Sequence, residues 1–440
     1  MSNEKKLLLV LAAVQFSHII DFMIIMPLGQ TIMNEFDISP GQFAWVVSAY
    51  AGAALTGNLF STAFIDRFDR RTALLFLFCG FTVATLGCAF APTYGFLLLA
   101  RAATGVFGGT LGALVITIVG DVVPLERRAT AMGWIMTAFS AASVAGVPAG
   151  IWIAAHYGWQ SPFIVTAIIA AIFVGVAYVV VPSLRGHLEG EGARSPVQGG
   201  LTAGTSPAAR GGKALADVLD DAAFQPTAEA LAPNAPDGFT GVFAPFARIF
   251  ADGNQRAALF FTLTLMLGHF TIIPFIAPYM QINIGFTSQQ ISLVYLVGGL
   301  LTVVLLPLFG KLADAYGHLR VFTIASFFAL FSIYALTNLE TDSLLIGLLT
   351  TSSFFVVASG RNPPATTMIT SVVRPANRGS FMSIRQSVNE AALFGSTLIA
   401  GFVITEGEGG LLVGYEYLGY FTMVMSVVAV AAASRLKPIA

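Results

Sequence analysis

Four charged residues stand deep inside stretches that are otherwise apolar: Asp21, Arg101, Arg361 and Glu390. An ionised side chain at the middle of a bilayer costs at least about 2.5 to 3.5 kcal/mol, so such groups normally face a cavity or a partner of opposite charge. Burial and a neighbouring cation act in opposite directions on the proton affinity of a carboxylate. A carboxylate and guanidinium pair whose water access changes could therefore load and release a proton.

The first expected pair joins Asp21 to Arg101. Asp21 lies about 21 Å into its stretch if that stretch is helical, and Arg101 lies at a comparable depth counted from the opposite end of another. His18 stands one helical turn before Asp21 and could share its face. It is either a hydrogen-bonded structural residue or a proton relay, and both readings stay open here.

The second expected pair is Arg361 with Glu390, both roughly 15 to 18 Å deep by the same count. They could form a buried ion pair or jointly bind a polar substrate. Asn389 and Arg385 lie close to Glu390 in the chain and join this candidate site. Arg385 is nearer the end of its stretch, so it could instead belong to the helix-end charges described below.

The composition requires membrane helices to position these groups. The chain has 440 residues, of which 56% are hydrophobic and 10% charged, and its mean hydropathy is +0.79. A soluble protein of this length could not bury so much apolar surface. Twelve apolar stretches are long enough to cross a hydrocarbon core of about 30 Å. Their approximate ranges are 7–33, 42–65, 72–92, 94–123, 129–156, 160–182, 257–284, 289–312, 320–338, 344–373, 380–404 and 416–434.

The basic residues predict the orientation. Of the 22 Lys and Arg residues, only Arg101, Arg361 and Arg385 lie deep inside spans. The others all fall at the two termini, in or next to the central segment, or in loops and span ends on the same side as these. Because Lys and Arg resist translocation, both termini are expected to be cytoplasmic. We expect a multi-pass protein of a bacterial inner membrane, with the first stretch retained as a helix rather than removed as a signal peptide.

The central segment 184–255 is rich in Gly, Ala, Pro and acidic residues, which predicts a cytoplasmic linker. It separates an N-terminal bundle of six helices, 1–183, from a C-terminal bundle of six, 256–440. Apolar residues at helical spacing over 242–250 indicate either a short interfacial helix or a disordered lead-in to the next span.

The two bundles repeat each other in sequence. The matched pairs are His18 with His269 and Pro27 with Pro278 at an offset of 251 residues, and Gln42 with Gln290 and Asp66 with Asp314 at 248. Parallel repeats of six spans are typical of one transporter architecture. His269 becomes a candidate site residue through this match, although no acid stands beside it.

Charged segments follow the second span of each repeat. The first contains Asp66, Arg67, Arg70 and Arg71, and the second runs from Gly310 to Arg320 and includes Asp314. A carboxylate there can face the positive N-terminus of a neighbouring helix, and the arginines can pair with an acid such as Asp121. Such a cluster can hold the halves together in one state and break in another. The plainer alternative is that the arginines only fix topology.

These motifs resemble the major facilitator superfamily. Gly310, Asp314 and Arg320 match its loop signature Gly-x-Leu-Ala-Asp-Arg-x-Gly-Arg-Arg/Lys, whereas the first copy lacks the glycines; Arg101 followed by Gly105 is similar to its span-four motif. The segment Gly146 to Gly150, with Pro148, resembles the glycine and proline motif of the drug/proton antiporters. The resemblance implies a conformational latch at the charged segments and helix sliding at Gly146, Pro148 and Gly150.

The sequence thus predicts an all-α membrane protein with 12 transmembrane helices in two six-helix pseudo-symmetric bundles. We expect a monomeric, proton-coupled exporter of small organic molecules, working by alternating access in the lipid bilayer. A proton-coupled importer or uniporter of the same fold is the alternative, and a non-transporting sensor is a third. The sequence contains neither a phosphate-binding loop nor a metal-ligand or nucleophile and base set, so we expect no enzyme, cofactor, metal or nucleic-acid partner.

Overall fold

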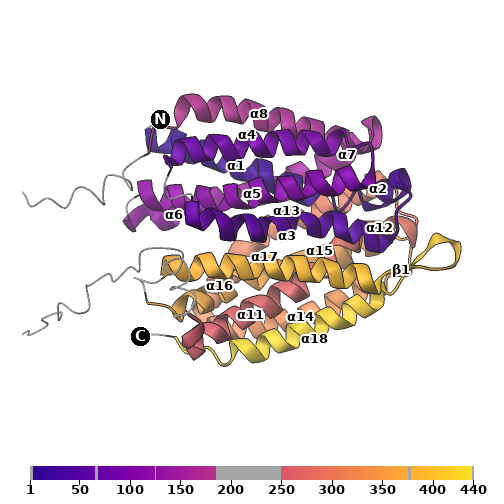
Figure 1. The fold of residues 1–440 in the computed structure, drawn as a ribbon. Coiled ribbons are helices and arrows are strands. Elements are labelled where there is room, and N and C mark those ends of the chain that lie inside the picture. Colours follow the sequence, from indigo (N-terminus) through magenta and orange to yellow (C-terminus); the bar gives the residue numbers. More distant parts are fainter. Residues whose placement is uncertain (1–2, 65–67, 124, 185–248, 375–377, 439–440) are drawn as a thin grey trace, which may run out of the picture.

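The computed structural model describes residues 3–64, 68–123, 125–184, 249–374 and 378–438. Its helices run lengthwise beside one another, with both ends of the chain at one end of the molecule (Figure 1). We call this the terminal end. The opposite end carries a small antiparallel hairpin of β1 (Thr405–Glu406) and β2 (Leu412–Val413), and we call it the hairpin end.

The regular elements of the N-terminal half are all helices in its described residues. It contains α1 (Asn3–Ile24), α2 (Gly29–Phe36), α3 (Pro40–Phe64), α4 (Arg70–Ala89), α5 (Tyr94–Val122), α6 (Leu125–Ala141), the π-helical turn η2 (Ala142–Gly146), α7 (Val147–Tyr157) and α8 (Ser161–Val180).

The C-terminal half repeats this plan and adds the hairpin. It contains α11 (Gly253–Phe270), the short 3-10 turn η4 (Ile273–Phe275), α12 (Ile276–Ile282), α13 (Ser288–Tyr316), α14 (His318–Thr337), α15 (Leu344–Gly360), α16 (Asn362–Ser371), α17 (Arg378–Val403), η6 (Glu408–Gly410) between the two strands, and α18 (Tyr415–Ala433). The proposed interfacial helix at 242–250 lies almost wholly outside the described residues.

Eleven helical stretches of the described chain are long and apolar enough to cross a membrane. The predicted eleventh span, α17, is not among them because it carries Gln386, Asn389 and Glu390 along its length. With 26 residues it is nevertheless long enough to cross the hydrocarbon core, and it makes the twelfth span. The prediction of an all-α membrane protein is confirmed.

Three predicted spans are broken helices rather than continuous ones. The first divides into α1 and α2 at residues 25–28, beside Pro27, and the seventh divides between α11 and α12 beside Pro274. The tenth divides into α15 and α16 at Arg361, directly before Pro363 and Pro364. Proline lacks the amide hydrogen and its ring crowds the preceding turn, which accounts for breaks at these positions.

The second charged segment is not the loop that the sequence predicted. Helix α13 continues through Gly310 and Asp314 to Tyr316, and α14 begins at His318. The only residue between them is Gly317, whose φ of 94° is accessible to glycine at little cost. The expected loop is therefore a tight turn between two long helices, and most of its charges project from helix ends.

Close packing in the N-terminal half depends on the glycines of α5. A Cβ atom added at Gly105 would lie 2.2 Å from the carbonyl oxygen of Tyr50, and one at Gly109 would lie 2.5 Å from the Cβ of Ala54. Both neighbours belong to α3, so the small residues let the two helices approach closely. This contact fixes Tyr50 beside α5.

The apolar core is divided differently at the two ends of the molecule. A cluster that includes Phe43 of α3 and Phe275 of η4 combines residues of both halves, and these two rings meet edge to face at 5.9 Å. Two further clusters each belong to one half alone, the first containing Leu7 and Leu184 and the second Ile249 and Leu436. The halves thus share a core at the hairpin end and have separate cores toward the terminal end.

Candidate proton and substrate site

A buried ion pair joins α1 to α5. Nη1 of Arg101 donates to Oδ2 of Asp21 at 2.8 Å, and it lies 3.4 Å from the backbone oxygen of Asp21. Both side chains have 0% exposed surface. The structure therefore brings together the two residues whose pairing was expected from their depth. Oδ1 of Asp21 has no hydrogen-bond partner in the described structure, so the carboxylate keeps free acceptor capacity.

Tyr50 connects this pair to His18. The guanidinium carbon of Arg101 lies 5.0 Å from the centre of the Tyr50 ring, a cation–π arrangement. The Tyr50 hydroxyl lies 3.5 Å from Nδ1 of His18, and Nε2 of His18 is buried without a partner among the described residues. His18 thus reaches the ion pair through Tyr50 and makes no hydrogen bond to Asp21. The sequence analysis missed Tyr50, for which the one available signal was a phenol inside an apolar stretch.

The second expected ion pair is absent from the described structure. Arg361 is 1% exposed, and its Nη1 donates to Oγ of Ser426 at 3.0 Å while its Nε donates to the backbone oxygen of Ala358 at 3.4 Å. Glu390 instead accepts a hydrogen bond from Nε2 of Gln386 at 2.8 Å. The expectation of an ion pair was wrong because Arg361 is directed to α18. Joint binding of a substrate remains open.

Arg385 lies inside the C-terminal half. Its Nη2 is 3.5 Å from Oγ1 of Thr366 on α16, and its Nε is buried without a partner in the described chain. The amide oxygen of Asn389, one turn further along α17, is likewise buried and unpartnered there. These contacts favour assigning Arg385 to the interior rather than to the charged turn at Asp314.

His269 occupies a mostly aromatic environment. Its ring stacks on Phe354 with centres 6.2 Å apart and meets Phe270 edge to face at 5.1 Å. Nδ1 has no hydrogen-bond partner in the part of the chain that the structure describes. His269 therefore lacks the tyrosine link that its repeat counterpart His18 possesses.

The first charged segment is bound within the N-terminal half. Nε of Arg70 lies 3.0 Å from Oδ2 of Asp121, and Nη2 of Arg71 donates to the backbone oxygen of Tyr178 at 2.6 Å. Asp69 caps α4 and accepts a hydrogen bond from Ser183 beyond α8 at 2.6 Å. These contacts join α4, α5 and the end of α8. Asp66 and Arg67 lie outside the described residues.

The second charged segment makes fewer contacts through its charged side chains than the first. Asp314 and Arg320 are exposed, and neither side chain forms a hydrogen bond or ion pair with another described residue. Gly310 faces open space, since an added Cβ there would meet nothing within 4 Å. The two copies are therefore unequal in this conformation, and the first has the ordered contacts.

The glycine and proline motif lies where the two halves meet. The carbonyl oxygen of Pro148 accepts a hydrogen bond from Oγ of Ser292 in α13 at 3.0 Å, across the interface. Gly146 and Gly150 face the other way, because Cβ atoms there would lie 2.5 and 2.3 Å from the Cδ1 atoms of Ile20 and Ile24 in α1. The motif is therefore packed between its own half and the opposite one.

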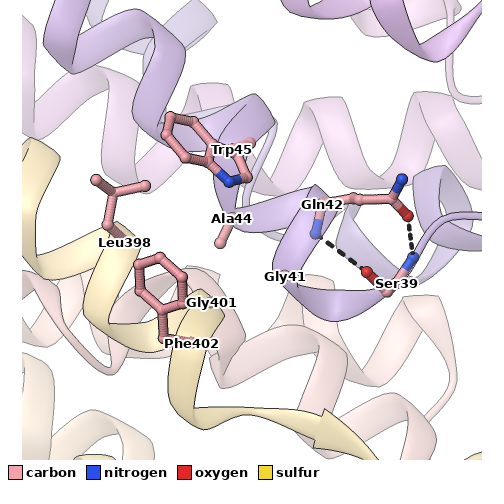
Figure 2. A pocket seen from close by; sticks show the side chains of 8 residues that line it. All are labelled: Ser39, Gly41, Gln42, Ala44, Trp45, Leu398, Gly401 and Phe402. Carbon is pink, nitrogen blue, oxygen red and sulfur yellow. Dashed lines mark hydrogen bonds between the residues drawn. The ribbon is translucent and has the colours of Figure 1, made fainter.

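A groove between α3 and α17 at the hairpin end has no charged lining (Figure 2). Its residues are Ser39, Gly41, Gln42, Ala44, Trp45, Leu398, Gly401 and Phe402. Ser39 and Gln42 form reciprocal hydrogen bonds of 2.9 and 3.3 Å that cap α3, and Thr287 and Gln290 cap α13 in the same way. The repeat noted at Gln42 and Gln290 thus corresponds to a shared helix start.

Known proteins resemble the chain along most of its length. The family model described as Major Facilitator Superfamily matches residues 11–247 and 258–439. The MFS-type transporter YhcA of Bacillus subtilis (strain 168) is 28% identical over 352 residues, 78% of this chain and 65% of YhcA. The inner membrane transport protein YdhP of Escherichia coli (strain K12) is 30% identical over 174 residues, 39% of this chain and 43% of YdhP. The match thus spans less than two thirds of the length of these relatives.

Solved structures share the fold. A crystal structure of a D-xylose–proton symporter superimposes with a TM-score of 0.71 at 14% identity, covering 99% of this chain and 98% of the other. An inward-facing, unoccupied bacterial homologue of the human lysosomal transporter Spinster gives 0.65 at 17% identity, covering 99% and 96%. The paired halves, the buried charges and the family match lead to one conclusion: the chain belongs to the Major Facilitator Superfamily of membrane transporters.

Proposed function

We propose that this transporter exports small organic molecules in exchange for protons by alternating access. The observation that carries the proposal is the fully buried pair of Asp21 and Arg101, 2.8 Å apart. A proton on Asp21 removes the charge that holds Arg101, and a substrate or water can then replace the carboxylate as partner. Loading and release of one proton is thereby linked to movement of α1 against α5.

Alternating access is supported by the uneven core. The halves are joined by Phe43 and Phe275 at the hairpin end and have separate cores toward the terminal end. The buried residues in the first half of α13 are Ile291, Val294, Tyr295, Gly298 and Gly299, whereas none of residues 300–311 is buried. With cytoplasmic termini, as the basic residues predict, we infer that this arrangement corresponds to the inward-open state of a protein in a bacterial inner membrane.

The remaining motifs have mechanical roles in this proposal. The contacts of Arg70 and Arg71 organise the terminal end of the N-terminal half, where a latch would close in the outward-open state. The hydrogen bond from Ser292 to Pro148 is a cross-half contact that sliding at Gly146 and Gly150 would break and remake. We propose that a monomer suffices, because both halves of the pathway belong to one chain.

Flux measurements in proteoliposomes test the proposal. A thermal-shift screen first supplies a ligand, whose movement is then followed under imposed pH gradients of either sign. We expect the substrate to accumulate only when protons moving down their gradient cross the membrane in the opposite direction. In Asp21→Asn this proton-driven accumulation should be lost, although the amide can still accept a hydrogen bond from Arg101. Asp342→Asn, at an exposed carboxylate between α14 and α15, is the matched control. Undiminished proton-driven accumulation in Asp21→Asn would show that this residue does not take part in proton coupling.

The same assay separates the alternatives. A proton-coupled importer would accumulate substrate in the direction of the proton gradient, as the name D-xylose–proton symporter says of one neighbour in fold. A uniporter would equilibrate substrate without responding to the gradient. A membrane sensor would bind the ligand and show no flux.

A further inference from the structure

The membrane interior contains more arginines than carboxylates. With α1 and α2 counted as one broken span, the charged side chains of the described residues at least six residues inside a membrane-crossing stretch are Asp21, Arg101, Arg361, Arg385 and Glu390. Asp21 and Arg101 neutralise each other. The C-terminal half is left with two guanidinium groups and one carboxylate.

Arg361 is held by uncharged groups only. Its described hydrogen bonds go to the Ser426 hydroxyl and the Ala358 carbonyl, and its Nη2 is buried without a partner. No described acidic side chain lies within 4 Å of it. A guanidinium stays protonated in proteins, so this buried positive charge lacks the close anion that normally offsets its loss of water.

Arg385 contacts the same helix as Arg361. Thr366, which accepts from Arg385, lies in the second turn of α16, and Arg361 directly precedes the first turn, so both arginines adjoin this short helix. Glu390 does not neutralise Arg385 directly. The two residues are five positions apart, which places their side chains about 140° apart around α17, and Glu390 accepts a hydrogen bond from Gln386 on its own helix.

We propose that the C-terminal half binds the anionic group of a small organic acid at Arg361 and Arg385, alongside α16. This inference rests on the proposed export function and specifies its substrate class. The planar fork of donors on a guanidinium matches a carboxylate in geometry and charge. The unpartnered amide oxygen of Asn389 can accept a hydrogen bond from the same molecule.

The environment suits an organic rather than an inorganic anion. Phe354 precedes Arg361 by seven positions, about two turns of α15, and therefore lies on the same side of the helix, and the ring of His269 stacks on it. An apolar or aromatic body can pack against these rings while its carboxylate meets the arginines. Inorganic ions would gain the charge contact and lose this packing.

Thermal unfolding of the full chain in detergent tests the site without any pH gradient. The probes are sodium benzoate, phenylacetate and hexanoate, each compared with its neutral amide and with sodium chloride at equal ionic strength. We expect at least one acid to raise the melting temperature in a concentration-dependent way, whereas its amide and chloride do not. Arg361→Gln and Arg385→Gln should each weaken the binding of that acid about tenfold or more. Arg256→Gln, at an exposed arginine, should leave the binding unchanged.

Several outcomes would overturn the inference. They are equal stabilisation by acid and amide, equal stabilisation by chloride, acid binding that survives in Arg361→Gln/Arg385→Gln, and no acid-specific shift with any probe. Folding is checked by the unliganded melting temperature of Arg361→Met, which should equal or exceed that of the parent because a buried charge without a carboxylate is removed. A large fall would show that Arg361 already has a structural counterion.

The two proposals fail in different experiments. Acid-specific binding with no proton-driven flux would contradict proton exchange and support the anion site. Proton-driven flux restricted to neutral or cationic molecules would contradict the anion site and support proton exchange.

Discussion

Nη1 of Arg101 lies 2.8 Å from Oδ2 of Asp21, and neither side chain has exposed surface. Because each residue is the charge partner of the other, a substitution at either one leaves a buried charge without its partner. The pair should therefore affect the free energy of unfolding as well as transport.

Removal of Arg101 alone should destabilise the protein strongly. In Arg101→Met, Asp21 remains buried without its counterion, a situation that costs about 3 to 5 kcal/mol in the free energy of unfolding. Asp21→Asn/Arg101→Met should recover much of this loss because no unpaired charge remains. Denaturant unfolding of the four proteins in a double-mutant cycle measures the coupling. Additive losses would show that the two residues do not stabilise each other.

Tyr50 should affect proton exchange more than folding. Tyr50→Phe keeps the ring over Arg101 and removes only the hydroxyl that lies 3.5 Å from His18. If His18 relays protons through Tyr50, both Tyr50→Phe and His18→Gln should slow proton movement several-fold with little change in melting temperature. A pH-sensitive dye inside proteoliposomes follows the protons. Unaltered rates in both variants would assign His18 a structural role.

Depth counted along an ideal helix predicted the Asp21 and Arg101 contact because both residues lie in regular parts of their helices. The same count failed for Arg361, which stands at the break between α15 and α16 and whose guanidinium donates to Ser426. Depth alone contains no information about which way a side chain points. Local breaks therefore limit what a helical count can predict.

Loop prediction failed for a related reason. The charges between Gly310 and Arg320 indicated a loop, yet α13 continues to Tyr316 because polar residues at a helix end lie in the headgroup region and need no break in the helix. The sequence did not predict a role for Tyr50, because that role depends on the close approach of α3 to α5 at Gly105. No local pattern in the sequence shows this tertiary contact.

Arg70 should influence conformational balance without much effect on stability. Its side chain is 5% exposed, but its partner Asp121 is 40% exposed, so solvent screens much of the attraction. Arg70→Ala should cost roughly 1 kcal/mol or less. Spin labels at the terminal ends of α4 and α14 should nevertheless report a changed distance distribution. An identical distribution in Arg70→Ala would contradict a latch role, and Arg256→Ala serves as the control.

Gly401 offers a direct test of closure at the hairpin end. A Cβ atom at this position would lie 2.3 Å from the Cβ of Ala44, which belongs to α3 in the opposite half. Gly401→Ala must therefore push α17 and α3 apart, and we expect it to shift the population toward states open at the hairpin end. Gly395→Ala is the matched control on the same helix, since an added Cβ there meets nothing within 4 Å. Double electron–electron resonance between labels at the hairpin ends of α3 and α17 measures the separation. If Gly401→Ala and Gly395→Ala give the same distribution as the parent, contact between these helices does not determine closure, and the shared core around Phe43 and Phe275 must hold the halves together by itself.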